Sequence, residues 1–447
     1  MTALRQFAKY ASLNTLAMIG ISCYILADTF FISIAEGHNG LTALNLVLPV
    51  YSILFALGAM IGTGSATRFV ILRARGEQSA EKCFSNAVEF AAAAGIVFMV
   101  IGGLFPEEVV RLLGGDAEII GVGTPYTRTF MLFSPCFVLN YVFTSFVRND
   151  GDPSVAMAGT LSSSLSNIAL DYLFMFPLGM GMRGAALATG ISPIISILVC
   201  CTHFLSKKNT IRFRLCLPSF RMLWGACQLG VAAFVGEISS GVTTAVLNFI
   251  VLGLAGNTGV AAYGVIANFA MVGTAIFNGI AQGAQPLMSR AYGEGDFAGA
   301  KKLLKLACVT ALAMAAAMLA AVMFTAPGLV GVFNSEGSAE LAALAEPGIR
   351  LYFIGFLFAS FDIVGTGFLS ATERAGAAFA AAVLRGFAAI TGFAFLLSAL
   401  WKMTGVWLAF PAAELLTAAV TAVALARWGR EKTGTFHKSG KENRNDP

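Results

Sequence analysis

The chain contains a series of twelve predominantly apolar stretches, each of about 20 residues or more, and these leave few folds open to it. A helix needs roughly that length to cross the hydrocarbon core of a bilayer. Charge clusters and Gly/Pro turns separate the stretches, which we place near 10–34, 42–67, 85–104, 122–146, 154–177, 185–206, 222–254, 259–287, 303–325, 347–370, 377–400 and 405–428. We therefore predict an all-α membrane protein with twelve transmembrane helices.

The composition supports this class of protein and excludes an ordinary soluble enzyme. Only 12% of the residues are charged, whereas a soluble domain carries roughly 25%. The eight cysteines include no CxxC pair and there are only three histidines, a pattern that argues against a metal cluster. We expect no bound cofactor. The first apolar stretch runs past a signal-peptide core without a convincing cleavage site, so we expect it to be a retained span.

The basic residues predict the orientation in the membrane. They gather at the N-terminus, in the links 68–84 and 207–221, after the eighth span and in the tail, whereas the alternate links hold only Arg111, Arg183 and Lys402. The positive-inside rule then places both termini and the long central link in the cytoplasm, and we expect the bacterial cytoplasmic membrane. Because this charge is spread over every inner link and not over one face, we expect no nucleic-acid partner.

An internal repeat is the next feature. A shift of 219 residues pairs Gly37 with Gly256 and Gly64 with Gly283 in one gapless window that also contains five further identities. We infer a duplicated six-span unit, with an N-terminal lobe at 1–215, a C-terminal lobe at 216–429 and a polar, disordered cytoplasmic tail at 430–447. Because six is even, both copies insert the same way up, related by a pseudo-twofold axis along the membrane normal.

Carboxylates inside spans are costly unless they face protein or a water-filled cavity, so they mark candidate sites. Six qualify: Asp28, Glu89, Asp171, Glu237, Asp362 and Glu414. Glu89 lies near the start of its span, where a charge readily reaches the membrane surface. Arg385 and Glu414, in the last two spans, are candidates for a structural ion pair.

Asp28 and Asp171 are expected at similar depth, because each lies about six residues from the outer end of an outward-running span. Asn167 precedes Asp171 by one helical turn, and Thr189 lies just inside the outer end of the sixth span. Four oxygen-bearing side chains at one level could hold a small cation or a shared proton; alternatively, they merely join neighbouring helices. In the second repeat, Ala388 and Gly392 occupy the positions that correspond to Asn167 and Asp171. Because the polar residues are absent from the second copy, an ion site is favoured over a packing role.

Several segments resemble the multidrug and toxic compound extrusion (MATE) family over nearly the whole chain. These are ADTFFISIAEGHNGLTALNLVLP in the first span and loop, RNDGDPSVAMAGTLSSSLSNIALDYLFMFPLGMGMRGAALATGIS across the fifth and sixth spans, QGAQPLMSRAYGEGD and GVWLAFPAAE. The AAxAT and GxQP elements are weak signals individually, but their order and spacing along the chain make the resemblance specific.

The resemblance implies an exporter of drugs or toxic organic compounds, driven by inward flow of sodium ions or protons through two lobes that form a V. Carried over by position, its N-lobe cation site consists of Asp28, Asn167, Asp171 and Thr189, which would be sodium ligands in a sodium-coupled member. Some members instead use acidic residues in the seventh and tenth spans. Glu237 fits the first, and Asp362 lies about one turn from the second. Asn278 and Gln282 in the eighth span could line this C-lobe site or form hydrogen bonds between helices.

The expected partners are the lipid bilayer and small-molecule substrates, chiefly lipophilic cations, for a protein acting as a monomer. Two other transporter classes compete. A lipid-linked saccharide flippase of the same superfamily would usually have more spans or a cationic cavity, and a major facilitator transporter lacks support because its signature after the second span is missing from RARGEQSAEK. An intramembrane hydrolase would need a nucleophile and a base, and Ser162–Ser166 have no histidine near them in sequence.

Overall fold

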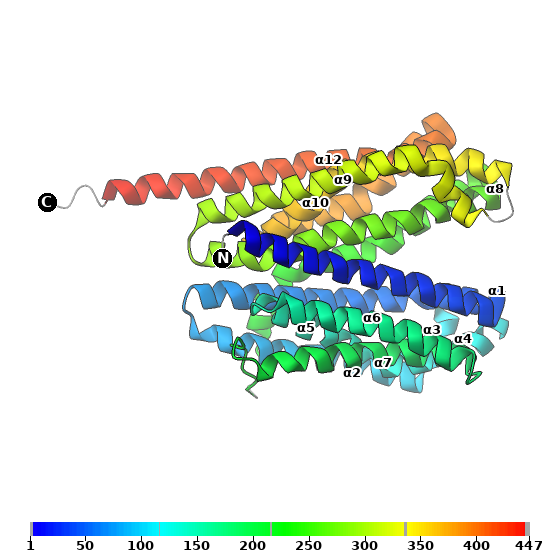
Figure 1. Ribbon diagram of the computed structural model, residues 1–447, viewed down its shortest axis with the longest axis horizontal. Coiled ribbons are helices and arrows are strands. Elements are labelled where there is room, and N and C mark those ends of the chain that lie inside the picture. The colour runs from blue at the N-terminus through cyan, green and yellow to red at the C-terminus, as the bar shows by residue number, and fades with distance from the viewer. Residues whose placement is uncertain (1–2, 116, 215–216, 335–337, 443–447) are drawn as a thin grey trace.

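The computed structural model describes the backbone of residues 3–115, 117–214, 217–334 and 338–442, and it is helical almost throughout (Figure 1). Residues 430–442, which the sequence analysis assigned to a disordered tail, continue the last helix in the described backbone; their side chains beyond residue 431, and residues 443–447, lie outside the described set. Helices are the expected form, because backbone polar groups in a hydrocarbon core can be satisfied only within the segment.

The N-terminal half consists of α1 (Ala3–Ala74), η1 (Gln78–Lys82), α2 (Cys83–Leu104), α3 (Pro106–Leu112), α4 (Ala117–Leu132), α5 (Ser134–Asn149), α6 (Pro153–Met175), α7 (Gly181–Cys201) and η2 (Thr202–Leu205). The C-terminal half consists of α8 (Phe220–Gly293), α9 (Phe297–Phe333), α10 (Ala339–Ala371), α11 (Ala375–Val383), the π-helical turn η3 (Leu384–Ala389) and α12 (Ile390–Glu442).

Twelve spans follow from these helices, as predicted. Eight helical stretches are long and apolar enough to cross a membrane among the described residues, and α4 with α5, bent by 45°, forms a ninth. The shorter α6 is a tenth. Two of the eight stretches hold two spans each, because α8 breaks at Gly256 and the stretch from α11 into α12 breaks at Trp401 and Lys402.

The predicted repeat is visible in the backbone. Gly37 divides α1 and Gly256 divides α8, and their conformations nearly coincide, with φ 59° and ψ −144° against φ 59° and ψ −153°. This region of backbone space is essentially restricted to glycine. The chain reverses near each of these glycines (Figure 1), so the same turn joins the first two spans of each half.

Replacing either turn glycine is expected to destabilise the fold by a similar amount. A Cβ at Gly37 or Gly256 would meet no other heavy atom within 4 Å, so the cost of Gly37→Ala or Gly256→Ala is backbone strain alone, about 1–3 kcal/mol. Thermal unfolding of the purified protein in detergent measures it. Gly121→Ala, a helical glycine whose added Cβ also meets nothing, is the control. An unchanged midpoint in both turn variants would contradict the strained conformation.

The two halves contact each other reciprocally through α1 and α8. A Cβ on Gly64, in the second part of α1, would lie 2.1 Å from the Ala226 carbonyl oxygen in the first part of α8. A Cβ on Gly283, in the second part of α8, would lie 2.6 Å from the Tyr10 carbonyl oxygen in the first part of α1. Because this glycine pair is one that the repeat aligns, the contacts follow the expected pseudo-twofold symmetry.

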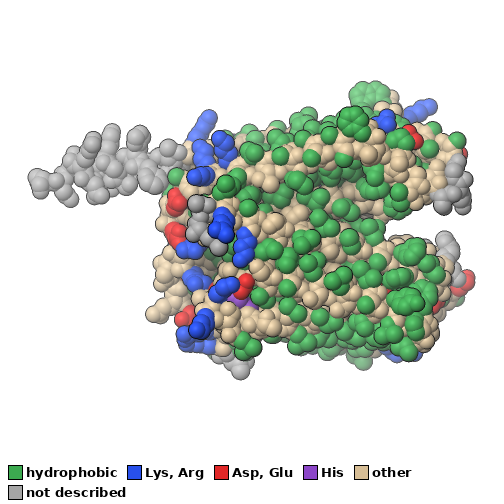
Figure 2. Space-filling model, in the orientation of Figure 1, with side chains coloured by type: hydrophobic (Ala, Val, Ile, Leu, Met, Phe, Trp, Pro, Cys, Tyr) green, Lys and Arg blue, Asp and Glu red, His purple; other side chains and the backbone are tan. Residues whose placement is uncertain are grey.

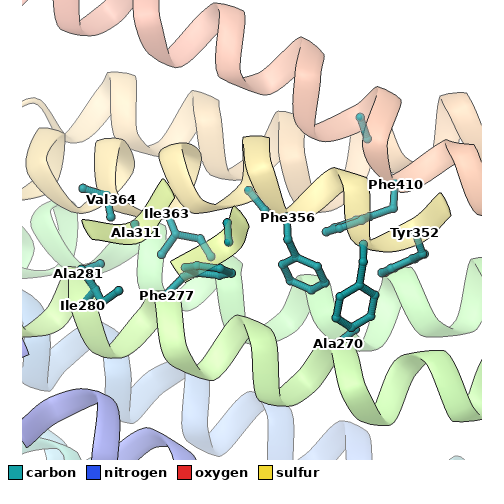
Figure 3. Packing of buried hydrophobic residues seen from close by; sticks show 14 of the residues in the cluster. Ala270, Phe277, Ile280, Ala281, Ala311, Tyr352, Phe356, Ile363, Val364 and Phe410 are labelled. Carbon is teal, nitrogen blue, oxygen red and sulfur yellow. The ribbon is translucent and has the colours of Figure 1, made fainter. Parts of the chain in front are cut away.

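Each half has its own hydrophobic core, one built mainly from residues 32–223 and the other from residues 247–428. In the C-terminal half, Tyr352 of α10 stacks on Phe410 of α12 at 4.3 Å between ring centroids, beside Phe356 and Phe277 (Figure 3). The boundary predicted at 215/216 falls on two residues that the structure does not describe.

The molecule has two chemically different ends. Lys and Arg side chains gather at the end of the molecule where α1 begins and α12 ends, here called the basic end (Figures 1 and 2). At the opposite end a cleft separates the two halves, and hydrophobic side chains cover much of the surface between the two ends (Figure 2). The halves therefore meet at the basic end and diverge at the other.

Candidate cation and substrate site

The four residues of the predicted N-lobe site lie together inside the N-terminal half. Asp28 comes from the first part of α1, Asn167 and Asp171 from α6, and Thr189 from α7. All are buried, and Asp171 is 0% exposed. The Asn167 Nδ2 donates a hydrogen bond of 3.3 Å to the Thr189 Oγ1, and the carboxyl groups of Asp28 and Asp171 interact directly with each other.

Several oxygens of this group have no hydrogen-bond donor among the described residues. They are the Asp28 Oδ1, the Asn167 Oδ1 and both carboxyl oxygens of Asp171. A buried acceptor without a partner costs about 1–3 kcal/mol, and two facing carboxylates repel each other. A proton shared between the carboxyls, or a small cation among the oxygens, would remove both penalties. The group is therefore chemically suited to hold either one.

Tyrosines surround the acidic pair. Tyr51 and Tyr126 share a short hydrogen bond between their hydroxyl groups, and Tyr51 stacks on Phe130 with ring centroids 3.7 Å apart. Tyr126 and Tyr24 both lie within electrostatic range of Asp28 and Asp171. Flat aromatic faces beside carboxylates are the surroundings that an organic cation favours. Tyr51 and Tyr126 were not distinguishable in sequence from the many aromatic residues that only pack.

The four residues proposed for a C-lobe site have different partners. Glu237, in the first part of α8, lies within electrostatic range of Tyr24 and Tyr141 of the N-terminal half. Gln282 accepts a hydrogen bond of 2.9 Å from Arg148 of α5, and Asn278 is half-buried one turn before it. Glu237 and Gln282 thus interact with the N-terminal half, Glu237 beside the N-lobe tyrosines and Gln282 at the contact between halves.

Asp362 belongs to a separate group in the C-terminal half. The Arg385 Nε donates hydrogen bonds of 2.7 and 3.0 Å to the two carboxyl oxygens of Glu414, which confirms the predicted ion pair. Asp362 lies within electrostatic range of both, and neither of its carboxyl oxygens has a hydrogen-bond partner of good geometry in the described chain. Arg385 lies in the π-helical turn η3, a distortion that often accompanies functional sites.

A buried arginine, which sequence reasoning did not single out, joins the halves near the basic end. Arg148, 5% exposed, donates hydrogen bonds to Asn14 at 3.2 Å and to Gln282 at 2.9 Å, and it forms no ion pair in the described part of the chain. The Gln285 Nε2 donates to the Thr67 Oγ1 at 3.0 Å nearby. The only signal for Arg148 in the sequence is its place at the head of the RNDGDP motif.

The same motif anchors the central link. Asp150 accepts hydrogen bonds from Arg73 at 2.7 Å, from His203 at 2.9 Å and from the Thr210 backbone at 2.8 Å. Burial by itself would raise the pKa of Asp150, but the hydrogen bonds from His203 and Thr210 and the charge of Arg73 together lower it below its usual value. This carboxylate therefore stays charged and ties the link to the N-terminal half.

Two bundles of six spans, a cleft between them and buried carboxyl groups within the spans define a polytopic membrane protein of the secondary-transporter type. The MatE family model matches residues 15–173 and 232–395, one segment in each half. The chain belongs to the MATE family.

Curated relatives agree over most of their length. The chain is 27% identical over 398 residues to the multidrug export protein MepA of Staphylococcus saprophyticus, covering 88% of this chain and 87% of that protein. It is 28% identical over 424 residues to MepA of Staphylococcus aureus, covering 93% and 91%.

Solved structures show the same fold. An outward-facing multidrug resistance MATE family transporter of the MOP superfamily superposes with a TM-score of 0.89 at 22% identity, over 97% of this chain and 96% of that one. A MOP superfamily transporter from Pyrococcus furiosus, for which reverse polarity of the binding pocket suggests a different function, superposes with a TM-score of 0.87 at 22% identity, over 96% and 95%. The likeness extends over both halves, as the predicted V-shaped architecture requires.

Proposed function

We propose that this protein is a secondary active antiporter that exports lipophilic organic cations in exchange for sodium ions or protons. The observation that carries the proposal is the buried pair Asp28 and Asp171, whose carboxyl groups interact directly beside tyrosine rings. Staphylococcal relatives named as multidrug export proteins support the same activity. The orientation we propose puts the basic end in the cytoplasm, so that the cleft opens outward.

The proposed exchange needs no covalent chemistry. An ion and a drug that favour opposite access states each help to release the other, and a coupling free energy of about 1–3 kcal/mol is typical. The ion would bind at Asp28, Asn167, Asp171 and Thr189, where several buried oxygens accept no hydrogen bond from the described residues. The drug would contact the neighbouring tyrosines. We propose that one chain performs the whole cycle, because each half already supplies its own core and the cleft lies between the halves of a single chain.

The charge of the candidate site argues against a second possible function, that of a flippase for lipid-linked saccharides. Such substrates carry phosphate or pyrophosphate and would need cationic groups in the cavity. Here the candidate groups are carboxyls: Asp28 and Asp171 are buried in the N-terminal half, and Glu237 lies within electrostatic range of Tyr24. A repulsive pair of like charges in a low-dielectric cavity costs several kcal/mol. These acidic groups therefore favour cationic over anionic substrates.

Transport of a fluorescent lipophilic cation by the reconstituted protein tests this function. Vesicles are prepared with a sodium gradient alone, with a pH gradient alone, and with neither, at the same membrane potential. We expect accumulation of the dye to follow one of the two gradients and to cease when that gradient is collapsed. Dye movement that ignores both gradients, or translocation of a phosphate-bearing lipid instead of the cation, would refute the proposal. The choice of gradient identifies the coupling ion.

A further inference from the structure

A groove of about 630 Å³ lies at the basic end, between the start of α9 and the end of the described part of α12. Its polar part is formed by Lys301 and Arg430, and its apolar part by Leu304, Leu425 and Ala426. Trp428, which is 4% exposed, forms another part of the wall. It packs edge-on against Phe368 with ring centroids 4.8 Å apart. The wall of the groove is thus fixed by the core behind it.

Ion pairs within the described chain neutralise some of the basic residues at this end, but not the two cations of the groove. Arg73 pairs with Asp150, Arg75 with Glu373, and Arg374 with Glu431, the residue next to Arg430. Lys301 and Arg430 form no ion pair within the described ranges, and the Trp428 indole N–H has no hydrogen-bond partner there. The groove thus presents two positive charges that the described protein does not neutralise.

The order of these residues along the helices matches the shape of a phospholipid. α9 begins at the basic end, so Leu304 lies one turn deeper than Lys301. α12 runs toward the basic end, so Leu425 lies deeper than Arg430. A ligand in the groove would meet positive charge at the membrane surface and apolar side chains below it. Basic pockets between transmembrane helices at the cytoplasmic side bind anionic lipid headgroups in this way, and a Trp at that depth is typical of the interface.

We propose that the groove between α9 and α12 is a binding site for an anionic phospholipid. Its phosphate lies between Lys301 and Arg430, and one acyl chain runs along Leu304 and Leu425. The inference goes beyond the transport activity, because it requires only that the protein is inserted in a bilayer. An anionic lipid is favoured over a zwitterionic one, since two unneutralised cations attract net negative charge and not phosphate alone.

Native mass spectrometry of the full-length chain purified in detergent tests the site, with phosphatidylglycerol and phosphatidylcholine of identical acyl chains as probes. Each basic residue near an anionic surface contributes enough that Lys301→Gln/Arg430→Gln should weaken phosphatidylglycerol binding by about 30-fold. The matched control is Lys302→Gln/Arg221→Gln, which removes two exposed cations at the same end outside the groove. This control should change phosphatidylglycerol binding by less than about threefold, because salt screens the attraction between the lipid and charges that do not contact it.

A second variant tests the groove independently of charge. Ala426 is exposed in the groove wall, so Ala426→Trp fills the cavity without disturbing the core, and it should weaken binding of both lipids. Equal losses in the charge variant and its control, or equal affinity for the two lipids in the unaltered protein, would overturn the proposal. So would displacement of the lipid by glycerol 3-phosphate at equal concentration, which would reveal a site for a soluble anion. None of these measurements uses transport, so their failure leaves the antiport proposal untouched.

Discussion

Asp28→Asn and Asp171→Asn are each expected to lower gradient-driven export by about 5- to 150-fold, the factor that corresponds to loss of a typical coupling free energy. Asn keeps the size of the side chain but cannot carry the charge or share the proton that the facing carboxyls need. The protein should still insert and elute as a single species, because neither Asp171 oxygen accepts a hydrogen bond that holds the described fold together. Dye transport in vesicles under the productive gradient measures the effect.

The double variant separates one shared site from two independent ones. If Asp28 and Asp171 act as a unit, Asp28→Asn/Asp171→Asn should be no worse than either single change, because residues in direct contact are not additive. Glu89→Gln is the matched control, since Glu89 is a half-buried carboxylate in α2, outside the group. If both single variants retain coupled transport, the coupling ion must bind elsewhere, at Glu237. Glu237→Gln would then be the variant that loses coupled transport.

Gln282→Leu is expected to shift the access equilibrium about 30-fold toward the state that is open at the basic end. Gln282 accepts a hydrogen bond from the buried Arg148 across the contact between halves. Leu removes this acceptor, and losing a hydrogen bond to a buried charge costs about 1.5–3 kcal/mol. That cost applies only while the halves are closed around Arg148, because water hydrates the guanidinium once they separate. Distances between spin labels on the two halves at the basic end measure the populations.

Gln282→Glu is expected to shift the access equilibrium in the opposite direction from Gln282→Leu. A carboxylate at this position would pair with the Arg148 guanidinium and supply the negative charge that its present neutral partners, Asn14 and Gln282, lack. The closed state at the basic end should then become more stable, and turnover should slow because each cycle must break a charged pair. Shifts in the same direction for the Leu and the Glu variants would show that Arg148 does not control this contact.

Much of the architecture could be predicted because the bilayer leaves few alternatives. Twelve apolar stretches predicted twelve spans, and the aligned Gly37 and Gly256 predicted a duplicated unit whose turns the structure shows to be nearly identical. The N-lobe set was also predictable. A one-turn spacing places Asn167 and Asp171 on one face of α6, and counting from the span ends places Asp28 at the same depth.

The residues proposed for a C-lobe site show that counting residues along a span does not predict which side chains meet. The family resemblance suggested Glu237 and Asp362, and Gln282 joined them as a polar residue within a span of the second half. In the structure, Glu237 faces tyrosines of the first half, Gln282 binds Arg148, and Asp362 lies with Arg385 and Glu414. Depth follows from position along a helix, but the choice of partner depends on how each helix is rotated about its axis and which neighbour it meets.

The amino-acid sequence was enough to predict the number of spans, the end that carries the basic residues, the repeat and the similar depth of Asp28 and Asp171. These are properties of a linear pattern that the thickness of the hydrocarbon core converts directly into structure. The packed fold was needed to show that the carboxyls of Asp28 and Asp171 meet, that Arg148 is buried between the halves and that Lys301 and Arg430 border one groove. Nearly uniformly apolar helices carry little amphipathic signal for their rotation, so packing between helices far apart in sequence selects which polar groups come together.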